Sequence, residues 1–160
     1  MATIELLAQT IAVGLLAGWL VLGVLENLRA PDVNRDVIAS ILSLDQLRRD
    51  QPQIYQAVRR NRIAHERAPH LLFRLIVAAE FTVAALLVAG TVSLVLALAG
   101  TASVETARAV AALGALGFTA IWGCFLVGGQ WFHYWASHEG AQLTHFVMTI
   151  WGLVTLLLLF

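Results

Sequence analysis

Four long runs of apolar residues dominate the chain, and each is long enough to cross a membrane as a helix. The first, residues 6–25, holds 20 residues without a charge. At about 1.5 Å per residue, such a helix matches the roughly 30 Å hydrocarbon core of a bilayer. Further spans are expected at residues 71–98, 109–135 and 143–160. The pattern predicts an all-α fold, an integral membrane four-helix bundle in which residues 1–160 form a single membrane domain.

The first span is expected to be a retained membrane anchor. Glu5 stands where a cleavable signal peptide would carry Lys or Arg, and the apolar run after it is too long for the hydrophobic part of such a peptide.

Residues 26–70 differ from the rest of the chain, because they hold eight of the ten Arg residues and six of the ten acidic residues. Apolar residues recur at helical spacing from Val33 to Leu47, which predicts a short amphipathic helix along the membrane surface. A second short helix is expected from Ile54 to Arg67. These two predicted helices can either contact lipid or pack on the bundle.

Four spans fix which segments share a side of the membrane. Both ends of the chain and the turn after residue 98 lie on one side, whereas the loop at 26–70 and the turn at 137–142 lie on the other. The positive-inside rule counts basic residues, and eight Arg in the long loop against Arg108 opposite place that loop in the cytoplasm. Ser103 can cap the third span, and Glu105 favours its positive end.

Composition agrees with a membrane protein and excludes other classes. Hydrophobic residues make up 59% of the chain and charged residues 12%, whereas a soluble domain is about half apolar and a quarter charged. The formal net charge is zero, so no nucleic-acid binding is expected. The single Cys124 excludes an intrachain disulfide and a multi-cysteine zinc site.

Ionisable side chains gather on the long-loop side, where all five histidines fall. One interpretation is a proton, quinone or haem site near that interface, because ionisable groups in spans are usually functional. The other is that the ends of spans are polar because headgroups are hydrated. The candidate functional cluster comprises Arg74, Glu80, Gln130, His133 and His145.

Glu80 shows most clearly the difference between a functional site inside the membrane and a hydrated end of a span. It lies about 13 Å along a helix from Leu71 but about 27 Å from Leu98. The second span is therefore either long and tilted with Glu80 buried, or it protrudes and leaves Glu80 in a polar zone. A buried Glu80 would be neutral or would need a partner, and the candidates on neighbouring helices are Gln130, His133 and His145.

The sequence assigns no cofactor, and haem b is the one that its histidines allow. A bis-histidine haem b needs two histidines at similar depth on different helices, which His145 with His70 or His133 can supply. Neither spacing is diagnostic. A metal site from His133, His138 and Glu139 is disfavoured, because a spacing of five residues puts the two histidines on different helix faces, and no metal site is predicted.

Small residues mark two of the spans. Gly14 and Gly18 form a GxxxG pattern in the first span. Gly114 and Gly117 make the third span locally narrow, because they carry no side chain. Small residues let helix backbones approach closely, either inside the bundle or against a partner. Near the end of the third span, Trp131 and the aromatic residues after it predict a belt at headgroup level.

The segment 125–132, with Trp135 and Ser137 after it, resembles a bacterial family described only as predicted small integral membrane proteins, a domain of unknown function. Further agreements are Ile-Leu-Ser-Leu-Asp at 41–45 and Ala-Ala-Glu at 78–80. The resemblance covers nearly the whole chain. Its motif, Gly-Gly-Glu/Gln-Trp-Phe, falls here on Gly128, Gly129, Gln130, Trp131 and Phe132.

The resemblance implies a multi-pass protein of the bacterial inner (plasma) membrane with no assigned activity, substrate or cofactor. Proteins of this kind more often carry basic residues at the N-terminus and in the middle turn, whereas this chain carries them at 26–70. The resemblance and the arginine distribution therefore favour different orientations.

Three functional hypotheses follow. The preferred one is a non-enzymatic accessory or assembly subunit that docks onto other membrane protein subunits or onto itself, since the chain is small and no catalytic signature is visible. No catalytic residue is predicted. The second is a redox anchor that binds haem b or quinone at the histidine side. The third is an oligomeric small transporter or channel in which Glu80 titrates.

Overall fold

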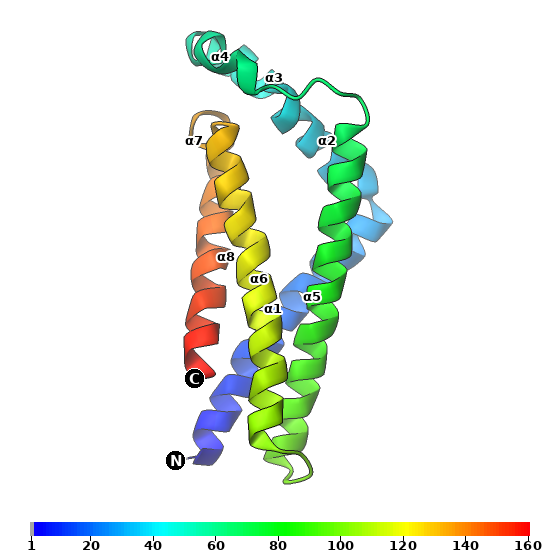
Figure 1. Cartoon of the computed structure of the whole chain (residues 1–160), viewed down its shortest axis with the longest axis vertical. Helices are drawn as coiled ribbons and strands as arrows, with labels where there is room; N and C mark the ends of the chain where they lie inside the picture. The colour runs from blue at the N-terminus through cyan, green and yellow to red at the C-terminus, as the bar shows by residue number, and fades with distance from the viewer. Residues whose placement is uncertain (1) are drawn as a thin grey trace.

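A computed structural model describes residues 2–160 as a bundle of four long helices (Figure 1). Each long helix is apolar enough to cross a membrane, and no strand occurs in residues 2–160. The predicted all-α membrane bundle is therefore confirmed. The long helices are α1 (Ala2–Arg29), α5 (Ala68–Leu98), α6 (Val104–Trp131) and α8 (Glu139–Leu158).

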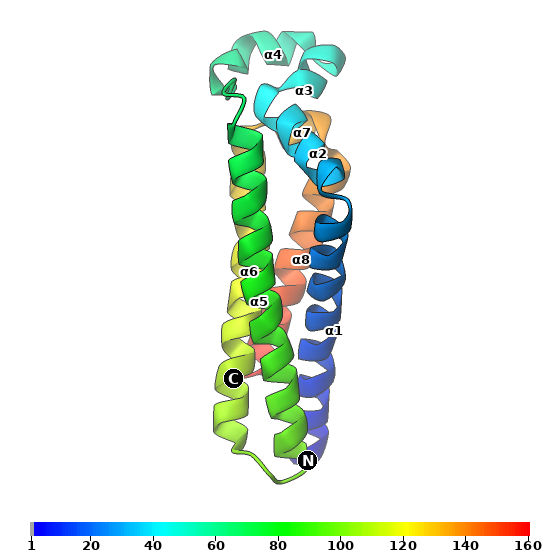
Figure 2. The same cartoon turned by 90° about the vertical axis from the view of Figure 1, so that its right-hand side faces the viewer.

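Five short helical segments cover one end of the bundle, as Figure 2 shows. Four of them belong to the long loop and one precedes α8. In chain order they are α2 (Pro31–Ser43), α3 (Asp45–Asp50), α4 (Pro52–Val58), the 3-10 helix η1 (Arg59–Asn61) and α7 (Tyr134–Ser137).

The arrangement of the chain ends follows the expected parity. Both ends of the chain and the turn between α5 and α6 lie at the end of the bundle opposite to α3, α4 and α7 (Figure 1). At that turn, the Ser103 hydroxyl accepts a hydrogen bond from the backbone N–H of Thr106 at 3.4 Å. The predicted N-cap of the third span is therefore confirmed.

Helices α5 and α6 form the most extensive contact of the bundle, with α1 packed mainly on α5 and α8 mainly on α6. Glycines permit the closest approach: a Cβ at Gly90 would lie 2.7 Å from the Cα of Ala111. Gly114 and Gly117 likewise face α5, where added Cβ atoms would meet Leu87 and Val83. Gly114 and Gly117, which were expected to make the third span locally narrow, therefore pack inside the bundle.

The two glycines of the first span, Gly14 and Gly18, lie in different environments. A Cβ at Gly14 would make an ordinary contact of 3.5 Å with Thr91 of α5, whereas nothing lies within 4 Å of a Cβ at Gly18. Gly14 therefore packs inside the bundle, and the position of Gly18 is open on the outer surface.

The outer surface of the long helices is apolar. Leu22, Val127 and Ile150 are examples, with 68%, 75% and 57% of their side chains exposed. Such a surface would be unfavourable in water and matches lipid tails. The bundle is therefore an integral, multi-pass membrane protein.

The long loop departs from the predicted pattern of helices. The prediction of one helix from Val33 to Leu47 is wrong, because Leu44 adopts a left-handed backbone conformation with φ of 56°. Two helices, α2 and α3, occupy this segment instead. This bend buries both Leu44 and Leu47. The second predicted helix also ends early, because residue 62 is extended and the Ile63 N–H donates to the Leu42 carbonyl at 2.8 Å.

The third and fourth spans have different limits from those predicted. Helix α6 ends at Trp131 rather than continuing to residue 135, because His133 adopts a left-handed conformation with φ of 58°. The chain then forms α7, and α8 begins at Glu139, four residues before the predicted start, and ends at Leu158. The reversal at His133 directs Tyr134 back against α6.

Candidate functional site

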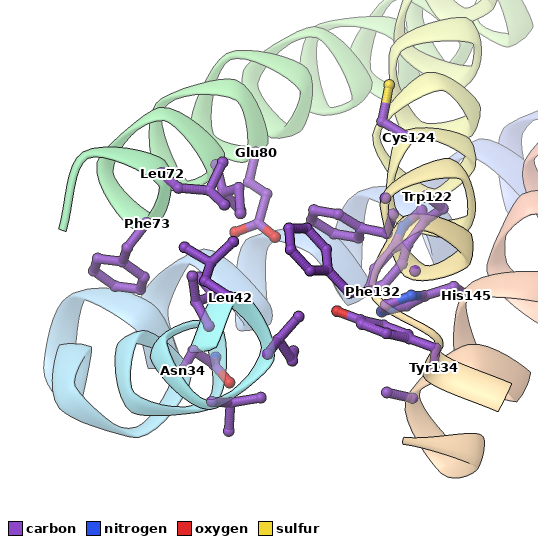
Figure 3. Close-up of a pocket in the computed structure, with 18 of the residues that line it drawn as sticks. Asn34, Leu42, Leu72, Phe73, Glu80, Trp122, Cys124, Phe132, Tyr134 and His145 are labelled. Carbon is purple, nitrogen blue, oxygen red and sulfur yellow. The ribbon is translucent and has the colours of Figure 1, made fainter. Parts of the chain in front are cut away.

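A cavity of about 470 Å³ lies on the long-loop side of the bundle, lined by residues of α1, α2, α5, α6, α7 and α8. Most of its wall is apolar. Figure 3 shows the Glu80 carboxylate and the Tyr134 hydroxyl pointing toward the same space, with His145 beside Tyr134. The side chains in its wall that can hydrogen-bond through N or O atoms are Asn27, Asn34, Glu80, Trp122, Tyr134 and His145.

Glu80 is buried inside the protein and fixed by one hydrogen bond. Only 7% of Glu80 is exposed, and its Oε2 accepts a hydrogen bond of 2.8 Å from Asn27 Nδ2. Asn27 Oδ1 in turn accepts a bond of 2.6 Å from Asn34 Nδ2 on α2. A polar chain therefore runs from the exposed Asn34 to the buried carboxylate, and Glu80 Oε1 is left available to a ligand.

The opposite wall is a cluster of aromatic rings around His145. The ring centroid of His145 lies 5.0 Å from Phe125, 5.4 Å from Trp122 and 5.8 Å from Tyr134. Two buried nitrogens in this wall, Trp122 Nε1 and His145 Nδ1, have no hydrogen-bond partner among residues 2–160. Buried polar atoms are normally paired, so these two nitrogens are candidate ligand contacts.

Tyr134 supplies a hydroxyl that stays protonated. Burial raises the pKa of Tyr134 to about 12, so at neutral pH its O–H can donate a hydrogen bond. The ring lies against Gly129, where an added Cβ would come within 2.8 Å of Tyr134 Cδ2. Gly129 therefore permits the position of Tyr134.

His138 closes the turn next to this cluster. Its ring centroid lies 5.4 Å from that of Tyr134, and its Nδ1 lies 2.9 Å from the Ser137 hydroxyl. Burial lowers the pKa of His138, although attraction to Asp50 opposes this effect. Burial therefore favours the neutral form of this side chain.

Helix α8 indicates how deep the cavity lies. Its 20 residues extend about 30 Å, which spans the hydrocarbon core with little excess. His145 is six residues from Glu139, about 9 Å along the helix. Helix α5, with 31 residues and about 46 Å, extends beyond the core. The cavity thus lies in the part of the hydrocarbon core nearest the long loop, and protein covers Glu80 there.

Comparison with known families agrees with the membrane architecture of the chain. Residues 5–160 match the family described as predicted small integral membrane protein (DUF2165). The chain belongs to this family. The resemblance stated from the sequence is thereby confirmed, and the family is one of unknown function. Comparisons with curated proteins and with solved structures gave no match.

In this DUF2165 protein, the structure brings together only part of the predicted polar cluster. Glu80 and His145 line the cavity. Arg74 and Gln130 are exposed and do not line it, and the half-buried His133 places its Nδ1 3.2 Å from the Trp131 carbonyl oxygen. The partners expected for Glu80 were therefore wrong, because the last turn of α1 packs on α5 and supplies Asn27 instead.

The residues of the Gly-Gly-Gln-Trp-Phe segment, 128–132, divide in the same way. Gly128, Gly129 and Phe132 line the cavity, whereas Gln130 and Trp131 are exposed on the last turn of α6. Among the histidines, His145 alone lines the cavity, so neither His70 nor His133 pairs with it there.

Sequence reasoning did not single out Asn27, Asn34, Trp122 or Tyr134 as residues of a shared site. Asn27 and Tyr134 stood at the ends of spans, Asn34 in the long loop and Trp122 inside the third span, and no spacing connected them. An asparagine in the last turn of an apolar helix was the one available signal, because such an amide needs a buried partner.

Proposed function

We propose that this protein is a non-enzymatic membrane protein that binds a lipophilic molecule of the quinone class. Such a molecule is a planar ring with oxygen atoms on opposite sides and an apolar tail. The observation that carries the proposal is the pair of buried, unpartnered nitrogens, Trp122 Nε1 and His145 Nδ1, in an otherwise apolar wall. The proposal retains the quinone part of the redox-anchor hypothesis.

The chemistry of the wall fits the two sides of such a ring. The Trp122 N–H can only donate, so it suits a carbonyl oxygen of the ring. Glu80 Oε1 suits a ring hydroxyl, which can donate to it. The aromatic side chains around His145 offer faces and edges against which a flat ring can stack.

The size and position of the cavity also support this class of ligand. A volume of about 470 Å³ falls within the range of about 300–1,000 Å³ that is common for small-molecule pockets. Since the cavity lies in the part of the hydrocarbon core nearest the long loop, the ring can enter it while an apolar tail stays in the lipid.

Binding of a short-chain benzoquinone and its quinol to the purified protein, measured by calorimetry in detergent, tests the proposal. We expect Trp122→Phe to weaken quinone binding about five- to thirty-fold, the effect of one lost hydrogen bond of about 1–2 kcal/mol. Glu80→Gln should weaken binding of the quinol more than that of the quinone, because the amide can donate to a carbonyl.

Trp151→Phe is the matched control, since Trp151 packs against the core and does not line the cavity. This control variant should bind as the unmodified protein does. Absence of saturable quinone binding, or equal losses in Trp122→Phe and Trp151→Phe, would contradict the proposal.

We also propose that the protein acts as an accessory subunit of a larger complex in the bacterial inner membrane. The open position of Gly18 on the lipid-facing side of α1, next to Trp19 with 46% exposure, supports docking of a partner helix. Purification of the tagged protein in mild detergent, followed by mass spectrometry, should recover stoichiometric companions. Gly18→Leu should lose them, whereas Gly123→Leu on α6, also open, should retain them.

A further inference from the structure

The arginines of the long loop divide into paired and unpaired groups. Arg35 forms ion pairs with Asp32 at 2.7 Å and Asp36 at 3.0 Å. Arg48 pairs with Asp45 at 3.2 Å. The acids that neutralise these two arginines therefore lie in the loop itself.

The arginines around η1 form no such pairs. Arg59, Arg60 and Arg62 are exposed, and within residues 2–160 none of the three forms an ion pair. Arg62 shares a surface depression with Asp36, Asp45 and Glu66, whereas Arg59 and Arg60 lie outside it. From residue 59 to residue 67 there are four arginines and one acid, Glu66. This short segment is therefore a concentrated positive charge.

Two hydrogen bonds hold this segment on the bundle. Asn61 Nδ2 donates to the carbonyl oxygen of Trp131 at 3.0 Å, and the Ile63 N–H donates to the carbonyl oxygen of Leu42 at 2.8 Å. The first bond connects η1 to the last residue of α6, and the second connects Ile63, two residues after η1, to α2. The three arginines thus have a defined position.

That position is at the membrane interface. Helix α6 ends at Trp131, which is 58% exposed, and Trp135 nearby is 48% exposed. Exposed tryptophans at the end of a span lie at headgroup level. Because η1 is bonded to Trp131, its arginines are at the level where lipid phosphates lie.

We propose that Arg59, Arg60 and Arg62 form a binding surface for the phosphate of an anionic phospholipid. The forked N–H groups of a guanidinium match two phosphate oxygens at once. Clusters of arginine at a membrane surface attract anionic lipid, and this surface keeps its charge because no acid pairs with it. The proposal is independent of the cavity and of any ligand in it.

The test is lipid retention by the full-length protein. The protein is equilibrated in detergent with equal amounts of phosphatidylglycerol and phosphatidylcholine and repurified, and the retained lipids are counted by mass spectrometry. We expect phosphatidylglycerol to be enriched in the unmodified protein. In R59Q/R60Q the enrichment should fall about five-fold for each arginine removed.

The control is R35Q/R48Q, which removes the same charge from the same loop but from arginines already paired with acids. It should retain the enrichment. Equal loss in both double variants would show that only net charge matters and would overturn the proposal, as would the absence of enrichment in the unmodified protein. If R59Q/R60Q does not fold, R62Q against R48Q makes the same comparison.

Discussion

Glu80 shows how one side chain inside the bundle depends on one partner. Its carboxylate is in a span, yet protein covers it and Asn27 donates to one of its oxygens. A buried acceptor that loses its donor costs its full desolvation, whereas removal of both partners together costs much less. The pair is therefore coupled energetically.

Asn27→Leu should destabilise the protein by about 1–3 kcal/mol, because Glu80 Oε2 loses its donor. Asn27→Leu combined with Glu80→Leu should recover most of this loss. Thermal unfolding in detergent, followed by circular dichroism, gives the comparison. Asn34→Ala, at the exposed end of the same chain of hydrogen bonds, is the control and should cost less. Additive effects in the double variant would contradict the coupling.

At the scale of elements, the contact between α5 and α6 depends on positions without a side chain. Gly90 of α5 faces the backbone of Ala111, and Gly114 of α6 faces the backbone of Leu87. These reciprocal contacts bring the two helices close together along the half of the bundle away from the long loop. Nearer the loop, Glu80 and Trp122 line the cavity instead.

Gly90→Ala should destabilise the bundle by about 1–3 kcal/mol, because its Cβ would meet the Cα of Ala111 and force α5 and α6 apart. Gly123→Ala is the matched control, since nothing lies within 4 Å of its Cβ. It should stabilise α6 by up to about 1 kcal/mol through helix propensity. The measurement is the unfolding midpoint in detergent, and equal shifts of both variants would refute this account.

The ends of the elements were predicted less well than the elements themselves. Leu44 and His133 both adopt left-handed conformations, which few residues other than glycine do. Neither position carries a turn signal in the sequence. Each bend returns the chain to the bundle, so that Leu47 and Tyr134 become buried.

At the scale of the whole molecule, a network of polar contacts connects three long helices at the end of the bundle where the chain begins and ends. Arg108 Nε donates to Gln9 Oε1 at 2.9 Å, and Gln9 Nε2 donates to the carbonyl oxygen of Leu158 at 2.8 Å. Arg108 also pairs with Glu5. These bonds connect α1, α6 and α8, so the single arginine on this side is engaged in structure.

The remaining arginines predict one orientation of the protein, which differs from the one that the family resemblance favours. Eight of the ten Arg residues lie in the long loop, so the positive-inside rule predicts that the loop is cytoplasmic and both chain ends are outside. The long loop and the turn between α5 and α6 lie at opposite ends of the bundle (Figure 2). The loop and this turn are therefore on opposite sides of the membrane in either orientation.

Labelling by a membrane-impermeant maleimide tests this orientation in a Cys124→Ala background. Ala102→Cys, in the exposed turn after α5, should react in intact cells. Ala64→Cys, in the exposed part of the long loop, should react only after the membrane is opened. The reverse pattern would support the opposite orientation, and reaction of both positions from the same side would contradict the topology.

The sequence by itself determined the four spans, the parity of the loops and the Ser103 cap. Each of these depends on residues close together in the chain, because hydropathy and capping are local properties. Only the tertiary structure decided which polar groups meet. Asn27, Glu80, Trp122 and His145 come from four different long helices, and their meeting depends on how close and at what register those helices pack. Small residues such as Gly90 and Gly114 set that packing through contacts distant in sequence, which no local pattern encodes.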